Sequence, residues 1–237
     1  MKIIALESSA VTASVAVCED EVLLAQAFQN SGLTHSVTLM PMAADLLKNA
    51  GLTLDDMDVV AVAAGPGSFT GIRIGVAAAK GLAWPGDKLC APCSTLESMA
   101  WQVAHMGGEI CAVMDARRQQ VYNGCFLGTE DGMVRLSEDR AIGLDELTEE
   151  VKKSGNPQIL VGDGAELCYN AFRAAGIPAR LAPPHLLRQT AWGVARAALE
   201  LARQGKLVPA GQMTPQYHRL SQAERERLER MKNQTNE

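Results

Sequence analysis

The chain has 237 residues, of which 47% are hydrophobic, 21% are charged and only 4% are aromatic. This composition excludes an intrinsically disordered or collagen-like chain, and the length is sufficient to bury a large core without disulfides. A net charge of −5 argues against tight, autonomous binding to nucleic acid, which needs clustered lysine and arginine side chains.

The elements in the first half of the chain follow the order strand, strand, strand, helix, strand, helix, strand, helix. The apolar patterns and the turn residues between them predict these elements at 2–7, 13–19, 21–29, 35–50, 58–64, 69–83, 89–91 and 95–105. The first strand ends on an acid, Glu7, and a Gly-x-Gly turn at 65–67 precedes the second helix.

The second half repeats this order. Its elements are predicted at 110–115, 120–127, 133–136, 144–153, 158–161, 165–175, 179–181 and 189–204. Its first strand again ends on an acid, Asp115, and a Gly-x-Gly turn at 162–164 again precedes the second helix. Strands interleaved with helices predict an α/β fold with mixed sheets. The duplicated order resembles the actin-like ATPase and sugar-kinase architecture (ASKHA, ribonuclease H-like).

We therefore expect two lobes, each a mixed sheet flanked by helices. The boundaries predicted are 1–106 for the first lobe and 107–220 for the second, with the helix near 189–204 packing back on the first lobe. The segment 221–237 is a densely charged tail that reads as a frayed helix or a disordered end. Contact of this tail with tRNA stays open, and the candidate residues for it are Arg225, Arg227, Arg230 and Lys232.

A nucleotide site between the lobes is one interpretation of the strand-end acids. Glu7 and Asp115 would hold a Mg-nucleotide, while Gly67 and Ser68 at the start of a helix would offer backbone N–H groups to phosphate. The other interpretation is a solvated acid in a turn and a tight turn in which Ser68 caps the helix. The segment 65–71 lacks the lysine of a P-loop, so it does not decide between them.

The first two predicted helices are apolar on nearly every side. A helix of this kind is buried on two sides, and in a small α/β protein one of those sides faces the sheet. The other side then needs a second layer, which a partner chain can supply; an ordinary core pair is the alternative. The predicted interface consists of Val37, Met40, Ala44, Leu47, Gly71, Gly75, Ala78 and Leu82.

The remaining chemistry-bearing residues form no strong motif. Cys90 and Cys93 have the spacing of a dithiol ahead of a helix, but no thioredoxin-like pattern surrounds them, so two buried thiols are the favoured interpretation. The four histidines show no metal-ligand spacing. No apolar run approaches the about 20 residues of a membrane span, and only four apolar residues precede Glu7, which is too short for a signal-peptide core. We expect a cytoplasmic protein without membrane contact.

The segment 63–82 closely resembles the signature of the bacterial TsaB family, also called YeaZ. Further similar segments are 5–9, 14–16, 94–97, 114–117 with 121–122, and 215–220. The resemblance extends from residue 2 to about residue 225. One departure is Glu7-Ser8, where the family usually has Asp-Thr, which weakens the inference of a nucleotide in this lobe.

This resemblance implies an accessory role in tRNA modification. The chain would be a non-catalytic subunit required for threonylcarbamoylation of the adenosine next to the anticodon, and it would bind a metal-containing catalytic paralogue of the TsaD type through its first lobe. A small TsaE-type ATPase would join the complex, tRNA would be bound through the complex, and the chain alone would form a homodimer.

The resemblance also implies that catalysis belongs to the paralogue. The positions of the paralogue's two metal-binding histidines correspond here to Thr95 and Met99, which are poor ligands for such a metal. We therefore expect no cofactor of its own, with ATP and a metal held by partner subunits. The alternative function is a stand-alone small-molecule kinase or ATPase of the same architecture that uses Glu7 and Asp115.

Overall fold

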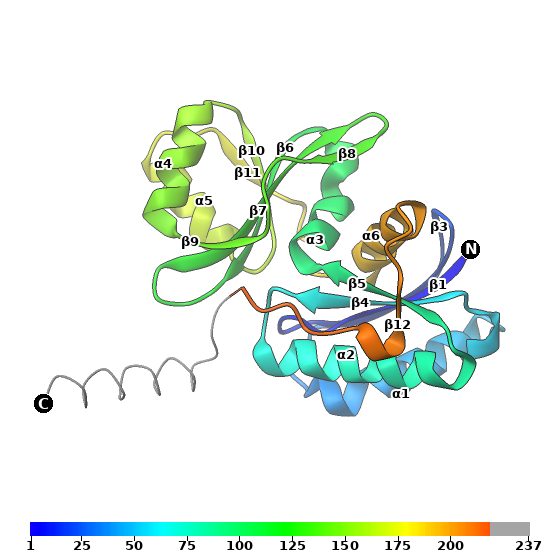
Figure 1. Cartoon of the computed structure of the whole chain (residues 1–237). Coiled ribbons are helices and arrows are strands. Elements are labelled where there is room, and N and C mark those ends of the chain that lie inside the picture. Colours follow the sequence, from blue (N-terminus) through cyan, green and yellow to red (C-terminus); the bar gives the residue numbers. More distant parts are fainter. Residues whose placement is uncertain (219–237) are drawn as a thin grey trace, which may run out of the picture.

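The computed structural model describes residues 1–218 and contains two six-stranded sheets set side by side (Figure 1). The tail and its candidate residues Arg225, Arg227, Arg230 and Lys232 lie outside the described residues. Within residues 1–218, none of the helices combines the length and the apolar character needed to cross a bilayer.

The first sheet has the strand order β12-β5-β4-β1-β2-β3. The strands are β1 (Lys2–Glu7), β2 (Ala13–Glu19), β3 (Val22–Gln29), β4 (Val59–Gly65), β5 (Leu89–Ser94) and β12 (Val208–Pro209). Strands β5, β4 and β1 run parallel, whereas β2, β3 and β12 are antiparallel to their neighbours. Both faces of the central strands are buried, which explains the unbroken apolar run of β4.

Two helices cover one face of this sheet, α1 (His35–Asn49) and α2 (Phe69–Ala83) (Figure 1). Side chains alternate along β1, so that Ile4 and Leu6 point into the core beneath these helices while Ile3 and Ala5 point to the other face. The apolar side chains that alternate onto this face of the strands therefore pack against the apolar side of each helix.

The second sheet has the order β11-β10-β6-β7-β8, with β9 also paired to β7. Its strands are β6 (Gly108–Asp115), β7 (Gln120–Thr129), β8 (Gly132–Arg135), β9 (Arg140–Gly143), β10 (Gln158–Val161) and β11 (Ala179–Leu181). Helices α4 (Leu144–Ser154) and α5 (Ala165–Ala174) cover one face through a core that includes Leu147, Cys168 and Phe172.

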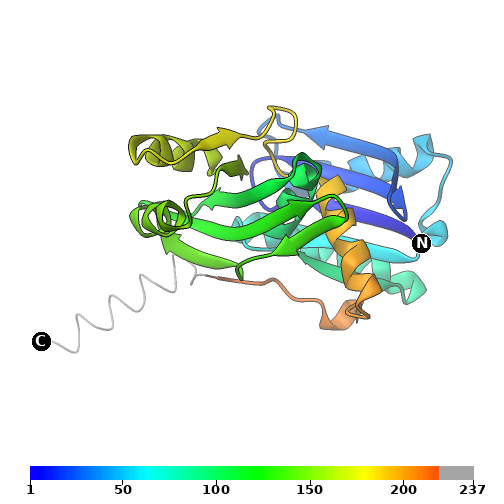
Figure 2. The same cartoon turned by 90° about the horizontal axis from the view of Figure 1, so that it is seen from above.

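Two helices exchange lobes. Helix α3 (Thr95–Val103) follows the first sheet in the chain but packs on the second, whereas α6 (Ala191–Arg203) follows the second sheet but packs on the first (Figures 1 and 2). They cross so closely that a Cβ at Gly193 would lie 2.0 Å from the carbonyl oxygen of Ser98. Helix α3 therefore packs with the second lobe, although the predicted boundary at residue 106 assigns it to the first.

The predicted repeat is otherwise present, with two additions. Strand β9 is absent from the predicted elements because four residues with Arg140 at their start carry no clear alternation. Strand β12 has only two residues, one of them a proline, and exists through its pairing with β5 at the sheet edge. Both additions depend on pairing with another strand of the same sheet.

Candidate functional site

The outward side of α1 is an apolar surface. Val37 and Met40 are 65% and 41% exposed, and Ala44, one turn further along, is exposed as well. This spacing places the three side chains on one face of the helix. These predicted interface positions are therefore available to a partner. Leu47, predicted with them, is instead buried in the core beneath the helix, so its predicted place at the interface is wrong.

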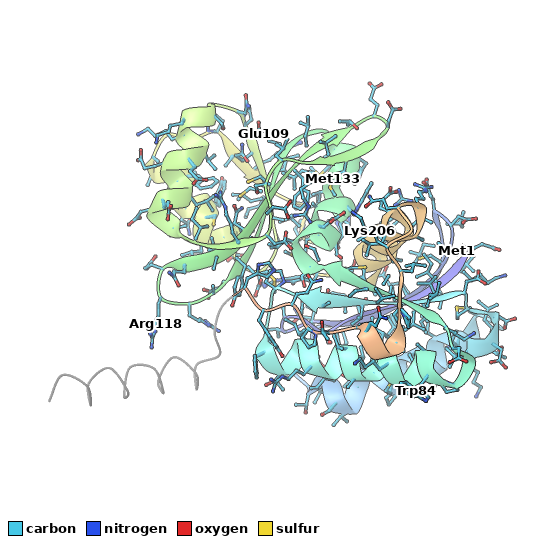
Figure 3. All side chains as sticks on the ribbon, in the orientation of Figure 1. Met1, Trp84, Glu109, Arg118, Met133 and Lys206 are labelled. Atoms are coloured by element: carbon cyan, nitrogen blue, oxygen red, sulfur yellow. The ribbon has the colours of Figure 1, made fainter. Side chains whose placement is uncertain are left out.

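The outward side of α2 carries small residues that end at a large one. Ala77 and Gly81 are exposed, and Trp84 at the end of the helix is 69% exposed (Figure 3). Since α1 and α2 pack beside each other, the two outward sides adjoin. We call the combined area the helix-pair surface, which consists of Val37, Met40, Ala44, Ala77, Gly81 and Trp84.

Gly71 and Gly75 face the interior of the chain, which corrects their predicted place at the interface. A Cβ at Gly71 would lie 2.1 Å from the carbonyl oxygen of Ser8, and one at Gly75 would lie 2.5 Å from the Ser8 hydroxyl. These glycines let α2 approach the turn between β1 and β2. Leu82 is also buried, and Ala78 is half-buried against the same core, so neither presents a free face.

Residues 216–217, which we call the C-terminal strap, hold the beginning of α2. The Gln216 amide donates to the Ala64 carbonyl oxygen over 2.7 Å. The ring of Tyr217 stacks on Phe69 at 4.8 Å, and the Arg73 guanidinium lies 3.7 Å from the centre of the Phe69 ring. Arg73 Nε also donates to the Tyr217 hydroxyl over 2.7 Å. The strap fixes the first turn of α2 next to the helix-pair surface.

The acids predicted for a nucleotide site are buried to different degrees. Glu7 is 1% exposed, and its carboxylate accepts a hydrogen bond from the Ser9 amide over 2.6 Å. Burial raises the pKa of Glu7 to about 7, against the lowering effect of the Ser9 hydrogen bonds. This is a carboxyl group sealed under a turn, and the interpretation as a solvated acid is wrong.

Asp163, which the sequence interpretation did not select, interacts electrostatically with both predicted acids. It accepts from Gln189 Nε2 at 3.0 Å, and burial raises its pKa, with a further contribution from the negative charge of Asp115. Its own charge in turn raises the pKa of Glu7. The sequence signal was available, because Asp163 is the middle residue of the second Gly-x-Gly turn. Asp115 itself is half-exposed and pairs with Arg117 at 3.2 Å.

The turn before α2 is closed by its own chain. The Ser68 amide donates to the Ser9 carbonyl oxygen over 2.6 Å, and the Ser68 hydroxyl caps the helix by accepting from the Gly71 amide at 3.3 Å. A Cβ at Gly67 would lie 2.5 Å from the Ser9 carbonyl oxygen. The prediction of Ser68 as a helix cap is therefore confirmed, and two N–H groups that a phosphate would need already have acceptors.

The positions that correspond to the paralogue's histidines lie in the core. Thr95 and Met99 are both 0% exposed, and the Met99 sulfur would lie 2.9 Å from a Cβ at Gly162. Met99 thus fills the space under the second Gly-x-Gly turn. Within the part of the chain that the structure describes, there is no group of three or more His, Cys, Asp or Glu side chains placed to hold a metal ion.

Cys90 and Cys93 do not meet. Both are fully buried, but Cys90 lies in the core under α1 and α2 while Cys93 lies on the opposite face of β5, where its thiol donates to the Val194 carbonyl oxygen of α6. Side chains three apart on a strand point to opposite faces. The dithiol interpretation of this pair is therefore wrong.

Comparison with known proteins agrees with this arrangement. The model of the family described as "TsaD: tRNA N6-adenosine threonylcarbamoyltransferase" matches residues 29–159. The chain is 33% identical over 167 residues to the tRNA threonylcarbamoyladenosine biosynthesis protein TsaB of Bacillus subtilis. The aligned residues cover 70% of this chain and 73% of that protein. The chain is 29% identical over 222 residues to TsaB of Escherichia coli, covering 92% and 95%.

The solved structures extend the comparison. YeaZ from Pseudomonas aeruginosa superposes with a TM-score of 0.77 at 26% identity, over 91% of this chain and 99% of that one. The activator of the 2-hydroxyisocaproyl-CoA dehydratase from Clostridium difficile, solved with bound ADPNP, matches with a TM-score of 0.50 at 13% identity, over 87% and 97%, which shows the fold alone. The predicted duplicated actin-like fold is confirmed. The chain therefore belongs to the TsaB family, the YeaZ proteins, whose members in Bacillus subtilis and Escherichia coli are named for tRNA threonylcarbamoyladenosine biosynthesis.

Proposed function

We propose that this chain is a non-catalytic subunit of a complex that makes threonylcarbamoyladenosine in tRNA, and that it binds a TsaD-type catalytic paralogue through the helix-pair surface. The observation that carries the proposal is the exposure of apolar and small side chains on two adjacent helices. The family model shared with TsaD supports a partner of the same fold.

The chemistry of the helix-pair surface suits packing between helices. Ala44, Ala77 and Gly81 are small, so that the backbone of a partner helix can come close, while Val37, Met40 and Trp84 add exposed apolar contact area. Burying a side chain such as Val37 or Met40 contributes about 1–2 kcal/mol when it lies at the centre of an interface. The same surface supports a homodimer when the paralogue is absent.

The closed turn before α2 supports a subunit that does no chemistry itself. Ser68 and Gly71 have their amides engaged, and Glu7 is buried, so the first lobe offers little of a phosphate cradle. In this proposal ATP and the metal are bound by partner subunits, among them a TsaE-type ATPase, and tRNA is bound through the complex.

The test is an Ala44→Arg variant with the purified TsaD-type paralogue. A charged side chain on this surface must lose its hydration when the helices meet, so complex formation should fall by more than tenfold, measured by size-exclusion chromatography and calorimetry. The matched control is Ala174→Arg, because Ala174 is likewise an exposed helical alanine but lies on α5 of the second lobe. It should bind normally.

Two results would overturn the proposal. One is an unchanged affinity of the Ala44→Arg variant while its circular dichroism matches that of the unmodified chain. The other is hydrolysis or transfer of phosphate from Mg-ATP by the isolated chain that is abolished by Asp115→Asn, which would instead establish the kinase or ATPase alternative.

A further inference from the structure

Cys111 and Cys125 lie directly opposite each other on two consecutive strands of the second sheet. Cys111 is on β6 and Cys125 on β7, and the antiparallel register pairs one with the other. Both side chains point to the face that α4 and α5 cover, since Cys111 belongs to the core there and Asn123, two residues before Cys125, reaches the Cys111 sulfur. Their side chains therefore share one face of the sheet.

The backbone hydrogen bonds define the type of pair. The Cys125 amide donates to the Ser137 hydroxyl oxygen over 2.9 Å, and the Cys125 carbonyl oxygen accepts from the Leu136 amide over 2.8 Å. Because the N–H and C=O of a strand residue point to the same side, both groups of Cys125 point away from β6. The backbones of Cys111 and Cys125 thus form a non-hydrogen-bonded pair of the antiparallel ladder, and in such pairs the Cα atoms are about 4.5 Å apart. That separation lies within the range of a disulfide.

One amide group contacts both sulfurs. Asn123 Nδ2 donates to Cys111 Sγ over 3.4 Å and lies 3.7 Å from Cys125 Sγ. Arg140 Nε donates to Asn123 Oδ1 over 3.3 Å, which turns the amide nitrogen toward the sulfurs. Arg140 is itself paired with Glu150 of α4. The thiols therefore share a donor whose orientation is fixed.

The environments of the two thiols differ. Cys111 is 0% exposed, whereas Cys125 is half-exposed at the break between β8 and β9. The hydrogen bond from Cys111 is the largest influence that lowers the pKa of Cys125, to about 6, and Asn123, Ser137 and the charge of Arg140 lower it further against the effect of burial. The pKa of Cys111 is raised well above its ordinary value, first by that same hydrogen bond and then by burial.

We propose that Cys111 and Cys125 form a redox-active pair that a peroxide converts into a cross-strand disulfide, with Cys125 reacting first. The Cys125 thiolate attacks one oxygen of hydrogen peroxide, the O–O bond breaks, and the products are a sulfenic acid on Cys125 and hydroxide. The Cys111 thiol then attacks the sulfenic sulfur, the S–S bond forms, and the hydroxyl group leaves with the Cys111 proton as water. Two electrons pass from the two thiols to the peroxide.

The other cysteines are placed less well for this reaction. Cys90 and Cys93 lie on opposite faces of β5. Cys168 on α5 is fully buried, and burial raises the pKa of its thiol to about 12. Only the thiol of Cys125 combines partial exposure with a lowered pKa among the cysteines that the structure describes. The oxidation should therefore be selective for one pair.

The experiment uses the reduced full chain, treated with hydrogen peroxide and then blocked with N-ethylmaleimide in denaturant. Digestion with trypsin and a glutamate-specific protease cuts after Glu97 and Glu109, which separates Cys111 from Cys90 and Cys93. The expected result is a linked pair of peptides that contain Cys111 and Cys125, with the thiol count falling from six to four.

Variants test the order of the two steps. Cys111→Ala should leave a sulfenic acid on Cys125 that dimedone traps, and Cys125→Ser should give neither the adduct nor the link. The matched control is Cys168→Ala, which removes a neighbouring buried thiol and should keep the link. If a variant does not fold, the peptide mapping of the disulfide in the unmodified chain still tests the proposal. The proposal would be overturned if Cys125 stayed entirely in the thiol form after peroxide treatment, or if the disulfide joined Cys111 to Cys168.

Discussion

Ser8 and Gly71 join the turn between β1 and β2 to the first turn of α2 at backbone contact. The Ser8 hydroxyl donates to the Gly71 carbonyl oxygen over 2.9 Å, and the Ser8 carbonyl oxygen occupies the space that a Cβ at Gly71 would need. This contact sets which side of α2 is buried. The helix-pair surface is therefore a consequence of two glycines that face inward.

Gly71→Ala should destabilise the chain, because its Cβ would lie 2.1 Å from a backbone oxygen that cannot move freely. We expect a loss of about 1–3 kcal/mol in the free energy of unfolding. Gly81→Ala is the matched control on the same helix, since among the described residues no atom outside the adjoining backbone of α2 comes within 4 Å of its Cβ, and it should stabilise by about 0.5–1 kcal/mol. Urea unfolding of both variants measures the difference, and equal effects would contradict the buried position of Gly71.

Glu7→Gln should change how stability depends on pH. The pKa of Glu7 is raised from its ordinary value of 4.5 to about 7, so between these values the folded state holds a proton that the unfolded state releases. The stability that this proton provides is present below about pH 4.5 and is lost as the pH rises toward about 7. The neutral amide removes this dependence.

The measurement for Glu7 is urea unfolding at several pH values between 4.5 and 8. Relative to the unmodified chain, the E7Q variant should gain up to about 1.4 kcal/mol for each pH unit until about pH 7, with no further gain above it. Glu166→Gln on the exposed side of α5 is the control and should show no such slope. A constant difference across this range would mean that Glu7 is ionised throughout.

Tyr217→Ala should release the strap from α2. The substitution removes both the stacking on Phe69 and the hydrogen bond from Arg73, so hydrogen exchange at the Gln216 amide should accelerate by more than tenfold. Tyr217→Phe keeps the ring and loses only the hydrogen bond, and its effect should be a few-fold. Exchange measured by mass spectrometry tests both, and unchanged protection in the Tyr217→Ala variant would show that the ring does not hold the strap.

Arg135→Met should weaken the contact between β8 and α3. Arg135 donates over 2.7 Å to Asp139 and over 2.7 Å to Glu97, and its guanidinium lies 4.7 Å from the centre of the Phe126 ring. Loss of the cation leaves a largely buried carboxylate at Asp139, so we expect destabilisation by about 1–3 kcal/mol.

The control for Arg135 is Arg173→Met, because Arg173 also lies over an aromatic ring, that of Tyr169 at 5.7 Å, but is exposed on α5. Its effect should stay below about 0.5 kcal/mol. Thermal unfolding of the two variants gives the comparison, and a loss of similar size in both would assign the effect to ring contact alone.

Several elements follow from local pattern. The predicted strands at 2–7 and 13–19 and the helix at 69–83 have the observed bounds of β1, β2 and α2, because apolar runs with a regular period end there at turn or capping residues. The helix-pair surface does not follow from such a local pattern. Leu47 and Met40 look alike in the sequence, and so do Gly71 and Gly81, but within each pair only one faces the interior.

The amino-acid sequence by itself determined the order of elements, the duplication and the family, because these depend on periodicity and on motifs within short stretches of chain. The tertiary structure alone decided the packing of α3 on the second sheet, the outward side of α2, and the burial of Glu7 beside Asp163. Each of these is a contact between residues distant in the chain, and a local pattern does not specify which distant surface a buried side chain will meet.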